Sequence, residues 1–305
     1  DSGAPKGTIN VGSAYETTDY SPITTSALGM GANWQVLEGL YRFDMSDYSV
    51  SPALAAGDPV KVSDTEYEIA LRDGAKFSDG TDVKAADVVS SYERTTGDKS
   101  IFRQFFTFVD SVSAKDDKTV TVKLKYPFSN LKERFVNVHV VPSSMSEDAL
   151  KAKPVGTGPY KYEAISATEI TAVPNEHYNG KTPAKAATLK WSVLKDDSAR
   201  LAAALGNSID IMEAVPADAA DKLKAASWTV DSKAGYGNPF MMFNTQKAPF
   251  DKPEVRRAFL KAIDKEKLVS SALRGQAVEA KSFLPEANPA FKKPATDLSY
   301  DKDAA

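Results

Sequence analysis

The sequence predicts a mixed α/β fold built as about two domains. Segments in which every second residue is apolar alternate along the chain with segments whose apolar residues recur at helical spacing. The composition is that of a globular protein, with 42% hydrophobic and 26% charged residues in a chain of 305. At roughly 100–200 residues per domain, this length provides two domains with substantial cores.

The first strand and the loop after it are expected near the amino terminus. Thr8–Ala14 alternates Ile9 and Val11 with polar residues, which predicts a strand. Tyr15–Gly31 is rich in threonine, serine and glycine and predicts a loop, because glycine favours conformations outside regular elements. A short helix is predicted over Trp34–Tyr41, where apolar side chains recur at helical spacing.

The clearest pattern lies between residues 64 and 94. Alternation of Tyr67, Ile69 and Leu71 with charged residues predicts a strand with one buried face. Two Asp-Gly turns enclose a short return strand at Lys76–Ser78, and a helix is expected from Lys84.

The remaining elements are predicted from the same two patterns, apolar residues at every second position for strands and at helical spacing for helices. Strands are predicted at Thr119–Tyr126 (with Val120, Val122, Leu124 and Tyr126 inward), Lys161–Ala164, Glu169–Val173, Ala187–Val193, Ile209–Met212 and Phe240–Asn244. Helices are predicted at Asp196–Leu205, Ala217–Ala226, from Pro253 onward and at Lys265–Leu273. From Phe283 the chain has three prolines and no apolar periodicity, so it is expected to stop in the middle of a domain.

Charge and motifs argue against several function classes. The net charge of −3, with basic and acidic residues mixed, predicts no nucleic-acid partner. Cysteine is absent, and no apolar run approaches the roughly 18 residues needed to cross a bilayer. Gly180–Thr182 and Gly29–Gly31 lack the further glycines of phosphate and dinucleotide loops. His139 and His177 lack metal-site spacing. No enzyme activity, metal or cofactor is predicted.

Five sequence blocks occur in a recognisable order. They are EYEIALRDGAKFSDG at Glu66–Gly80, GTGPY at Gly156–Tyr160, NEHY at Asn175–Tyr178, GNSID at Gly206–Asp210, and FNT, PF, VRRAF and AIDK within Phe243–Lys265. Together they resemble the family-5 bacterial extracellular solute-binding proteins of the dipeptide-, oligopeptide- and nickel-binding type. One departure is Lys84, where the family usually has threonine; loss of that capping hydroxyl weakens the helix start by about 1 kcal/mol.

The resemblance implies a two-lobed, periplasmic-binding-protein-like α/β fold of class II type, with an extra α+β domain inserted in the first lobe. Residues 1–33 and 155–238 would form the discontinuous first domain, and residues 34–154 the insert. Residues 239–305 would begin a second lobe that is incomplete in this chain.

The resemblance also implies a function. The protein would be the extracytoplasmic substrate-binding component of an ABC importer, capturing di- to oligopeptides between two lobes for delivery to the permease subunits. Nickel complexes and oligosaccharides are alternatives on the same scaffold, and an enzyme or sensory domain is the alternative of another class. A monomer is expected, either in the periplasm or, as a lipoprotein, on the outer face of the membrane. Its only expected contact with the membrane is an N-terminal lipid anchor, which lies outside this chain.

The resemblance implies ligand contacts on the loop after the first strand and where the chain crosses between lobes. An aromatic cluster and an apolar strand add further candidates. The candidates are Tyr15, Thr25, Ser26, Ala27, Met30, Phe105, His139, Tyr236 and Asn238. Three of these four groups have a plainer interpretation. The loop would simply be exposed, the Phe105 ring would belong to the core, and His139 would be a structural histidine whose hydrogen bonds are satisfied within the protein.

Overall fold

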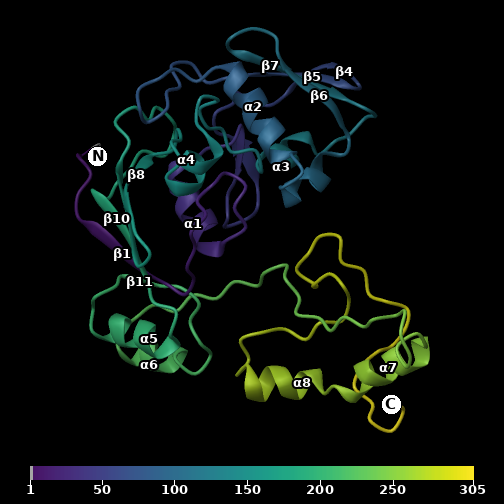
Figure 1. Ribbon diagram of the computed structural model, residues 1–305. Helices are drawn as coiled ribbons and strands as arrows, with labels where there is room; N and C mark the ends of the chain where they lie inside the picture. Colours follow the sequence, from purple (N-terminus) through teal and green to yellow (C-terminus); the bar gives the residue numbers. More distant parts are fainter. Residues whose placement is uncertain (1–2) are drawn as a thin grey trace. The chain divides into compact units, whose positions relative to one another are not determined.

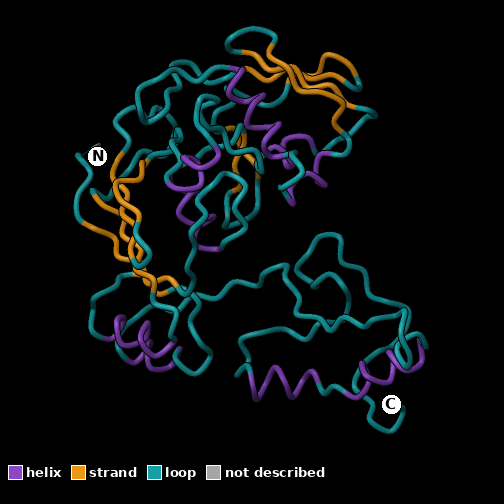
Figure 2. Tube along the Cα trace, viewed as in Figure 1, coloured by secondary structure: helices purple, strands orange, loops and turns teal. Residues whose placement is uncertain are grey.

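The computed structural model describes residues 3–305, which form two compact units (Figure 1). The first unit ends at Ala214, and the second runs from Val215 to Ala305. In Figure 2 the strands belong to the first unit, whereas the second consists of helices and loops. None of the helices within residues 3–305 has both the length and the apolar character needed to span a bilayer.

A five-stranded sheet forms the base of the first unit, in the order β11-β1-β10-β9-β8. Its strands are β1 (Thr8–Ser13), β8 (Tyr160–Ile165), β9 (Glu169–Pro174), β10 (Thr188–Val193) and β11 (Ile211–Met212). The amino-terminal strand β1 pairs in parallel with both β10 and β11, whereas β8, β9 and β10 are antiparallel. The sheet is therefore assembled from segments far apart in the sequence.

The two faces of this sheet are covered by different helices. Val11 and Trp191 are register partners, and both pack in the apolar cluster that holds Ala32 and Val36 of α1 (Ala27–Val36). Gly12 points to the opposite face, because a Cβ there would lie 2.7 Å from Cδ1 of Ile209. Helix α5 (Asp197–Leu205) contacts β1 and β11, so α1 and α5 lie on opposite faces.

A second, antiparallel sheet of order β4-β5-β7-β6 lies in residues 60–124. Its strands are β4 (Val60–Ser63), β5 (Glu66–Ala70), β6 (Val109–Ala114) and β7 (Thr119–Leu124). Helix α2 (Ala85–Thr95) packs on β6 and β7 over a core that includes Ile69, Val88 and Val122. The same core takes in residues of β2 (Tyr41–Phe43), β3 (Val50–Pro52), the 3-10 helix η1 (Ile101–Phe106) and α3 (Leu131–Phe135). Helix α4 (Glu147–Ala152) instead buries Leu150 in the apolar cluster of the five-stranded sheet.

The second unit contains α6 (Ala220–Ala225), α7 (Pro253–Ala262), α8 (Lys265–Lys267) and the π-helical turn η2 (Leu268–Ala272). Its clearest packing is a triangle of rings, in which Phe243, Phe250 and Phe259 have centroids 5.2–5.7 Å apart. Pro253 begins α7, as predicted, where its missing N–H costs no helical hydrogen bond.

The prediction for residues 15–41 is wrong in one respect. Helix α1 occupies Ala27–Val36, so the loop ends earlier than Gly31, and the helix predicted over Trp34–Tyr41 ends at Val36. The helix begins early because the Ser26 hydroxyl accepts a hydrogen bond from the Gly29 N–H. Glycine is needed at position 29 because the Asp19 backbone packs closely against it, and a Cβ there would lie 2.7 Å from the Asp19 carbonyl oxygen.

Five smaller predictions are wrong in whole or in part. Residues 76–78 make only an isolated bridge between Lys76 and Asp82, and residues 240–244 form no strand. Tyr126 is 50% exposed because β7 ends at Leu124. The strand predicted at 209–212 is shortened to β11, and the helix predicted at 265–273 changes to π-helical geometry at Leu268.

The helix predicted from Lys84 is confirmed, and its start has a substitute cap. The Asp87 carboxylate accepts a hydrogen bond from the Lys84 N–H at 2.9 Å, which satisfies a backbone donor of the first turn. The strands predicted at the positions of β1, β5 and β7 to β10 and the helix at α5 are confirmed as well. The domain boundaries at residues 33, 154 and 238 stay a prediction, and residues 1–2 of the first domain lie outside the described residues.

Candidate functional site

The carboxyl ends of β1, β10 and β11 lie along one edge of the five-stranded sheet, because the three strands are parallel. From β1 the chain continues to α1 on one face, and from β10 it continues to α5 on the other. This reversal makes the edge a topological switch point. In open α/β sheets, ligands bind in the crevice outside such carboxyl ends.

Polar groups gather at this edge. Oε2 of Glu213, just after β11, accepts hydrogen bonds from the Ser13 hydroxyl at 2.8 Å and from the Ala14 N–H at 3.2 Å. Oε1 of Glu213 accepts none from residues 3–305. Tyr15 follows directly and is 45% exposed. The edge thus presents a carboxylate oxygen and an accessible aromatic ring, a combination suited to a small polar solute.

The buried Arg200 of α5 binds the chain segments that follow β10 and β11. Its side chain is only 1% exposed. The guanidinium donates to the backbone oxygens of residues 194, 195, 213 and 214 at 2.8–3.1 Å and to the Asp197 carboxylate. A planar guanidinium with several donors can tie two loops together in this way. The chain segments after β10 and β11 are therefore fixed relative to each other, which preorganises the edge.

The predicted loop residues lie at the start of α1. Thr25 and Ala27 are exposed, and Met30 is 46% exposed. Ser26 is the helix cap, so its hydroxyl is already engaged by the Gly29 N–H.

His139 contacts the same loop, since its Nδ1 lies 3.3 Å from the Pro22 carbonyl oxygen. Because a carbonyl only accepts, Nδ1 carries the proton. Burial lowers the pKa of His139, while the Pro22 contact opposes that shift.

The other predicted residues lie elsewhere. Phe105 packs against the core of the second sheet, with the Arg134 guanidinium 5.6 Å from its ring centre, so the structure does not bring it to the loop. Tyr236 and Asn238 belong to the second unit, where the Asn238 amide donates to the Ser282 and Phe283 carbonyl oxygens. A role in ligand binding stays a prediction for all nine residues.

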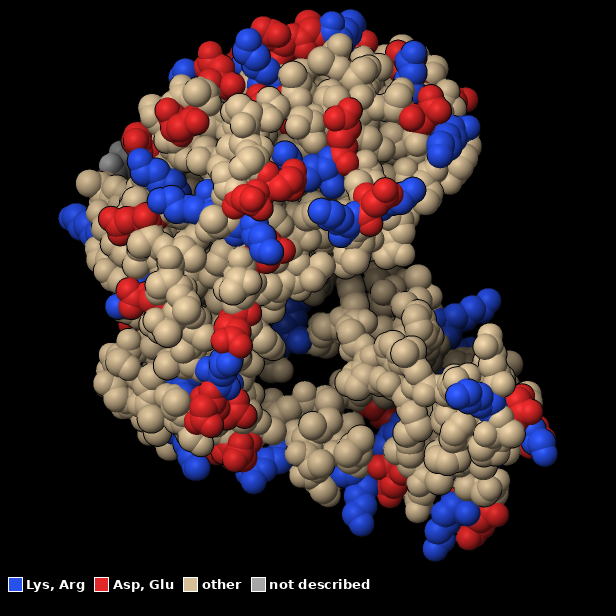
Figure 3. Space-filling model, in the orientation of Figure 1, with Lys and Arg blue, Asp and Glu red and all other residues tan. Residues whose placement is uncertain are grey.

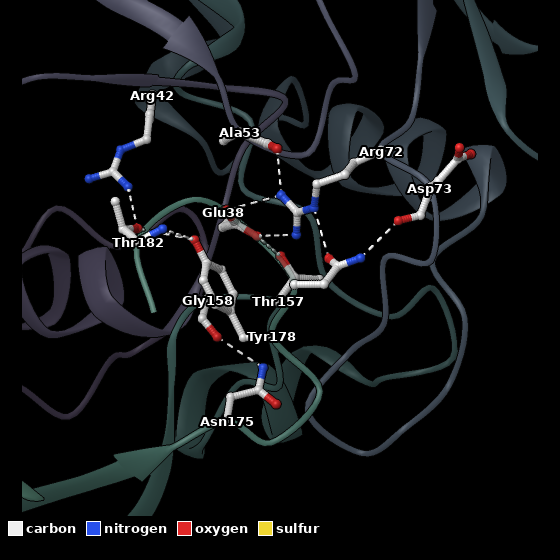
Figure 4. Close-up of polar contacts among 11 residues, drawn as sticks. Glu38, Arg42, Ala53, Arg72, Asp73, Thr157, Gly158, Asn175, Tyr178 and Thr182 are labelled. Atoms are coloured by element: carbon white, nitrogen blue, oxygen red, sulfur yellow. Dashed lines mark hydrogen bonds and ion pairs between the residues drawn. The ribbon is translucent and has the colours of Figure 1, made fainter. Parts of the chain in front are cut away.

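A buried polar cluster went unnoticed in the sequence (Figure 4). Glu38 and Arg72 form an ion pair at 3.1 Å, and the Thr157 hydroxyl donates to Glu38 at 2.9 Å. The Arg72 Nε donates to Asn179 at 2.9 Å, and its guanidinium lies 5.7 Å from the ring centre of Tyr178. Arg72 and Thr157 fall in two of the sequence blocks noted above, but the sequence gives no sign that both meet Glu38.

Charges elsewhere are dispersed. Lysine and arginine mix with aspartate and glutamate over the face of the first unit seen in Figure 3. Among residues 3–305, no three histidine, aspartate or glutamate side chains gather closely enough to hold a metal ion.

Comparison with known families identifies the class of protein. The model of bacterial extracellular solute-binding proteins, family 5 Middle, matches residues 49–305. The chain belongs to this family, whose members are binding proteins and not enzymes. The resemblance found in the five sequence blocks is thereby confirmed.

Among curated relatives, the chain is similar to the glutathione-binding protein GsiB. It is 27% identical to that of Pectobacterium atrosepticum over 288 residues, 91% of this chain and 55% of the relative. Identity to that of Escherichia coli (strain K12) is 27% over 292 residues, again 91% of this chain and 56% of the relative. The chain thus spans about half the length of the curated relatives it matches.

Solved structures share the fold. The periplasmic binding protein DppA from Helicobacter pylori, in complex with peptide STSA, matches with a TM-score of 0.87 at 21% identity, covering 98% of this chain and 64% of that one. The oligopeptide-binding protein AppA from Bacillus subtilis, with a nonapeptide, gives 0.83 at 23% identity, covering 98% and 63%. The chain therefore has the mixed α/β fold of class II periplasmic binding proteins over about 64% of their length.

Proposed function

We propose that the protein is the solute-binding component of an ABC importer and that its solute is a peptide. The observation that carries this proposal is the preorganised carboxyl edge of β1, β10 and β11 in a chain of the solute-binding family. Similar proteins support the peptide class, since relatives bind glutathione and matching structures hold peptide STSA, a nonapeptide and Met-Leu.

A peptide suits the chemistry of this edge. An extended peptide offers backbone donors and acceptors along its length, and an ammonium group at one end. Oε1 of Glu213 is free to accept a hydrogen bond, and the Tyr15 ring provides an apolar contact surface. Thr25, Ala27 and Met30 add accessible side chains from the first turn of α1.

The wider arrangement is part of the proposal. Residues 1–33 with 155–238 would form the first domain of one lobe, residues 34–154 its insert, and residues 239–305 the beginning of the second lobe. The solute would be enclosed between the lobes, with Tyr236 and Asn238 near the crossing. Release would be to permease subunits outside the cytoplasm, as the family description of extracellular proteins supports.

Other solutes are the alternative within the same family. Matching structures hold Ni(L-His)2 and the opine mannopinic acid, so the fold alone does not select peptides.

The test uses the full-length protein purified without added ligand. Mass spectrometry of the small molecules released on denaturation, followed by thermal-shift titration with di- and tripeptides, glutathione and Ni(L-His)2, identifies the class. We expect a co-purified peptide and a peptide-dependent rise in melting temperature without product formation. Stabilisation by Ni(L-His)2 alone, or no response to any peptide, would refute the peptide assignment.

A further inference from the structure

A cavity of about 630 Å³ lies in the first unit, and none of its lining residues belongs to the carboxyl edge of β1. It is walled by Trp34 of α1, by residues 42–46 and 51–53 around the β2–β3 turn, and by the loop at 178–182. Its size falls within the range of about 300–1,000 Å³ typical of small-molecule sites. The solute-binding proposal does not use this cavity.

Two cations in its lining are unpaired. Arg42 donates one hydrogen bond from Nη1 to the Thr182 hydroxyl at 3.1 Å, and within residues 3–305 it meets no carboxylate. Lys181, in the same loop, is exposed and makes neither an ion pair nor a side-chain hydrogen bond with any residue the structure describes. The remaining donors of both side chains are therefore available to an anion, and a guanidinium matches a carboxylate or sulfonate with two parallel bonds.

The acidic residues of the lining are already engaged. Glu38 is bound by Arg72 and by the Thr157 hydroxyl. Asp44 accepts hydrogen bonds from the backbone N–H and the hydroxyl of Ser46. The lining also holds three cations (Arg42, Arg72 and Lys181) against these two carboxylates, so the cavity has an excess of positive charge for a ligand.

Aromatic rings complete the lining, and one of them is held firmly. The Tyr178 hydroxyl accepts a hydrogen bond from the Thr182 N–H at 3.1 Å and lies 3.0 Å from the Thr182 hydroxyl. The loop closes tightly around it, since a Cβ at Gly180 would lie 2.2 Å from the Tyr178 oxygen. With Trp34 partly exposed in the same lining, a flat apolar group has rings to pack on.

We infer that this cavity is a second binding site, for a small organic anion in which a carboxylate or sulfonate is attached to an aromatic ring. Arg42 and Lys181 bind the anionic group, and Trp34 and Tyr178 contact the ring. The inference goes beyond solute capture at the sheet edge and does not depend on it.

A matched pair of probes tests the site. Full-length protein is titrated with 1-naphthoate and with 1-naphthamide, which has the same ring system but no charge, by calorimetry and by intrinsic tryptophan fluorescence. We expect saturable binding of naphthoate that is at least about tenfold tighter than that of naphthamide, because charge-assisted bonds exceed neutral ones by that margin. Equal affinities, or no binding of naphthoate, would overturn the inference.

Substitutions locate the binding. Arg42→Gln and Lys181→Gln should each weaken naphthoate about tenfold, and Trp34→Phe should abolish the fluorescence change. Lys181→Gln removes no ion pair or side-chain hydrogen bond within the described residues, so it tests the site even if Arg42→Gln perturbs folding. Lys99→Gln removes another exposed lysine and should leave affinity unchanged. Wild-type affinity in Lys181→Gln, or displacement of naphthoate by the solute of the sheet edge, contradicts a separate site.

Discussion

Glu38 and Arg72, 34 residues apart in the sequence, form an ion pair with 3.1 Å between Oε1 and Nη2. Their side chains are 8% and 18% exposed, so neither charge is well solvated. Thr157, from the loop before β8, donates to the same Oε1. The pair and Thr157 thus join three segments that are distant in the chain.

Removing one partner of this pair should destabilise the first unit strongly. Glu38→Leu or Arg72→Met leaves the other charge buried and unpaired, which typically costs about 3–5 kcal/mol. The double variant Glu38→Leu/Arg72→Met should lose clearly less than the sum of the two single losses. Urea unfolding of the three variants measures this coupling. Additive losses would show that the two side chains do not depend on each other.

Even the conservative replacement of Arg200 by lysine should destabilise the protein. Arg200→Lys keeps the charge but leaves several of the four bound backbone oxygens without a donor, at about 1–3 kcal/mol for each unsatisfied buried group. Denaturant unfolding should show a loss of about 2–4 kcal/mol in total. Arg103→Lys is the matched control, because Arg103 is 62% exposed in its pair with Asp98, and it should change stability by less than about 0.5 kcal/mol.

Alanine substitutions at two glycines should have opposite effects, because a Cβ clashes at one position and fits at the other. A Cβ at Gly158 would lie 2.5 Å from the Gln35 carbonyl oxygen and 2.7 Å from a Val36 backbone carbon, so Gly158→Ala should destabilise by more than about 2 kcal/mol. Gly31, inside α1, has no atom within 4 Å of its Cβ position. Gly31→Ala should therefore stabilise the helix by about 0.5–1 kcal/mol. Thermal unfolding of the two variants should shift in opposite directions, and shifts in the same direction would contradict this packing.

Stability should depend on pH through His139. Its pKa lies below the ordinary value of 6.5 because burial disfavours the charged ring, so the unfolded chain takes up a proton before the folded one does. The stabilisation is complete above pH 6.5, declines as pH falls below 6.5, and stops declining once the folded form is protonated. Urea unfolding between about pH 7.5 and 5.5 should show a steeper loss in the wild type than in His139→Gln. Equal slopes would contradict the assignment.

Much of the fold could be predicted from local pattern. Alternation of apolar and polar residues predicted β5 and β7, and the block from Glu66 to Gly80 indicated the family. The start of α1 was missed because Gly29 and Gly31 were interpreted as breakers. A Ser26 cap and a close approach at Gly29 outweigh glycine's low helix propensity there. The pairing of β1 with β10 and β11 is a long-range choice that no local pattern reveals.

The site was less predictable for the same reason. Tyr15 and Met30 were identified as loop residues, and both are accessible. Glu213 and Arg200 were not singled out, since their roles depend on which strands are neighbours in the sheet. Phe105 belongs to a core because its aromatic neighbours pack around it, which spacing alone did not distinguish from a cleft position.

Calorimetric titration of a peptide into the full-length protein and its Tyr15→Ala/Met30→Ala variant tests the central claim most directly. The peptide is the one that co-purifies with the wild type, and Tyr126→Ala, which removes a ring that is 50% exposed near the end of β7, is the control. We predict one-to-one binding by the wild type and the control, and about tenfold weaker binding by the double variant, because accessible aromatic side chains often dominate binding energy. Equal affinity in all three proteins would place the peptide away from the carboxyl edge of β1 and contradict the account.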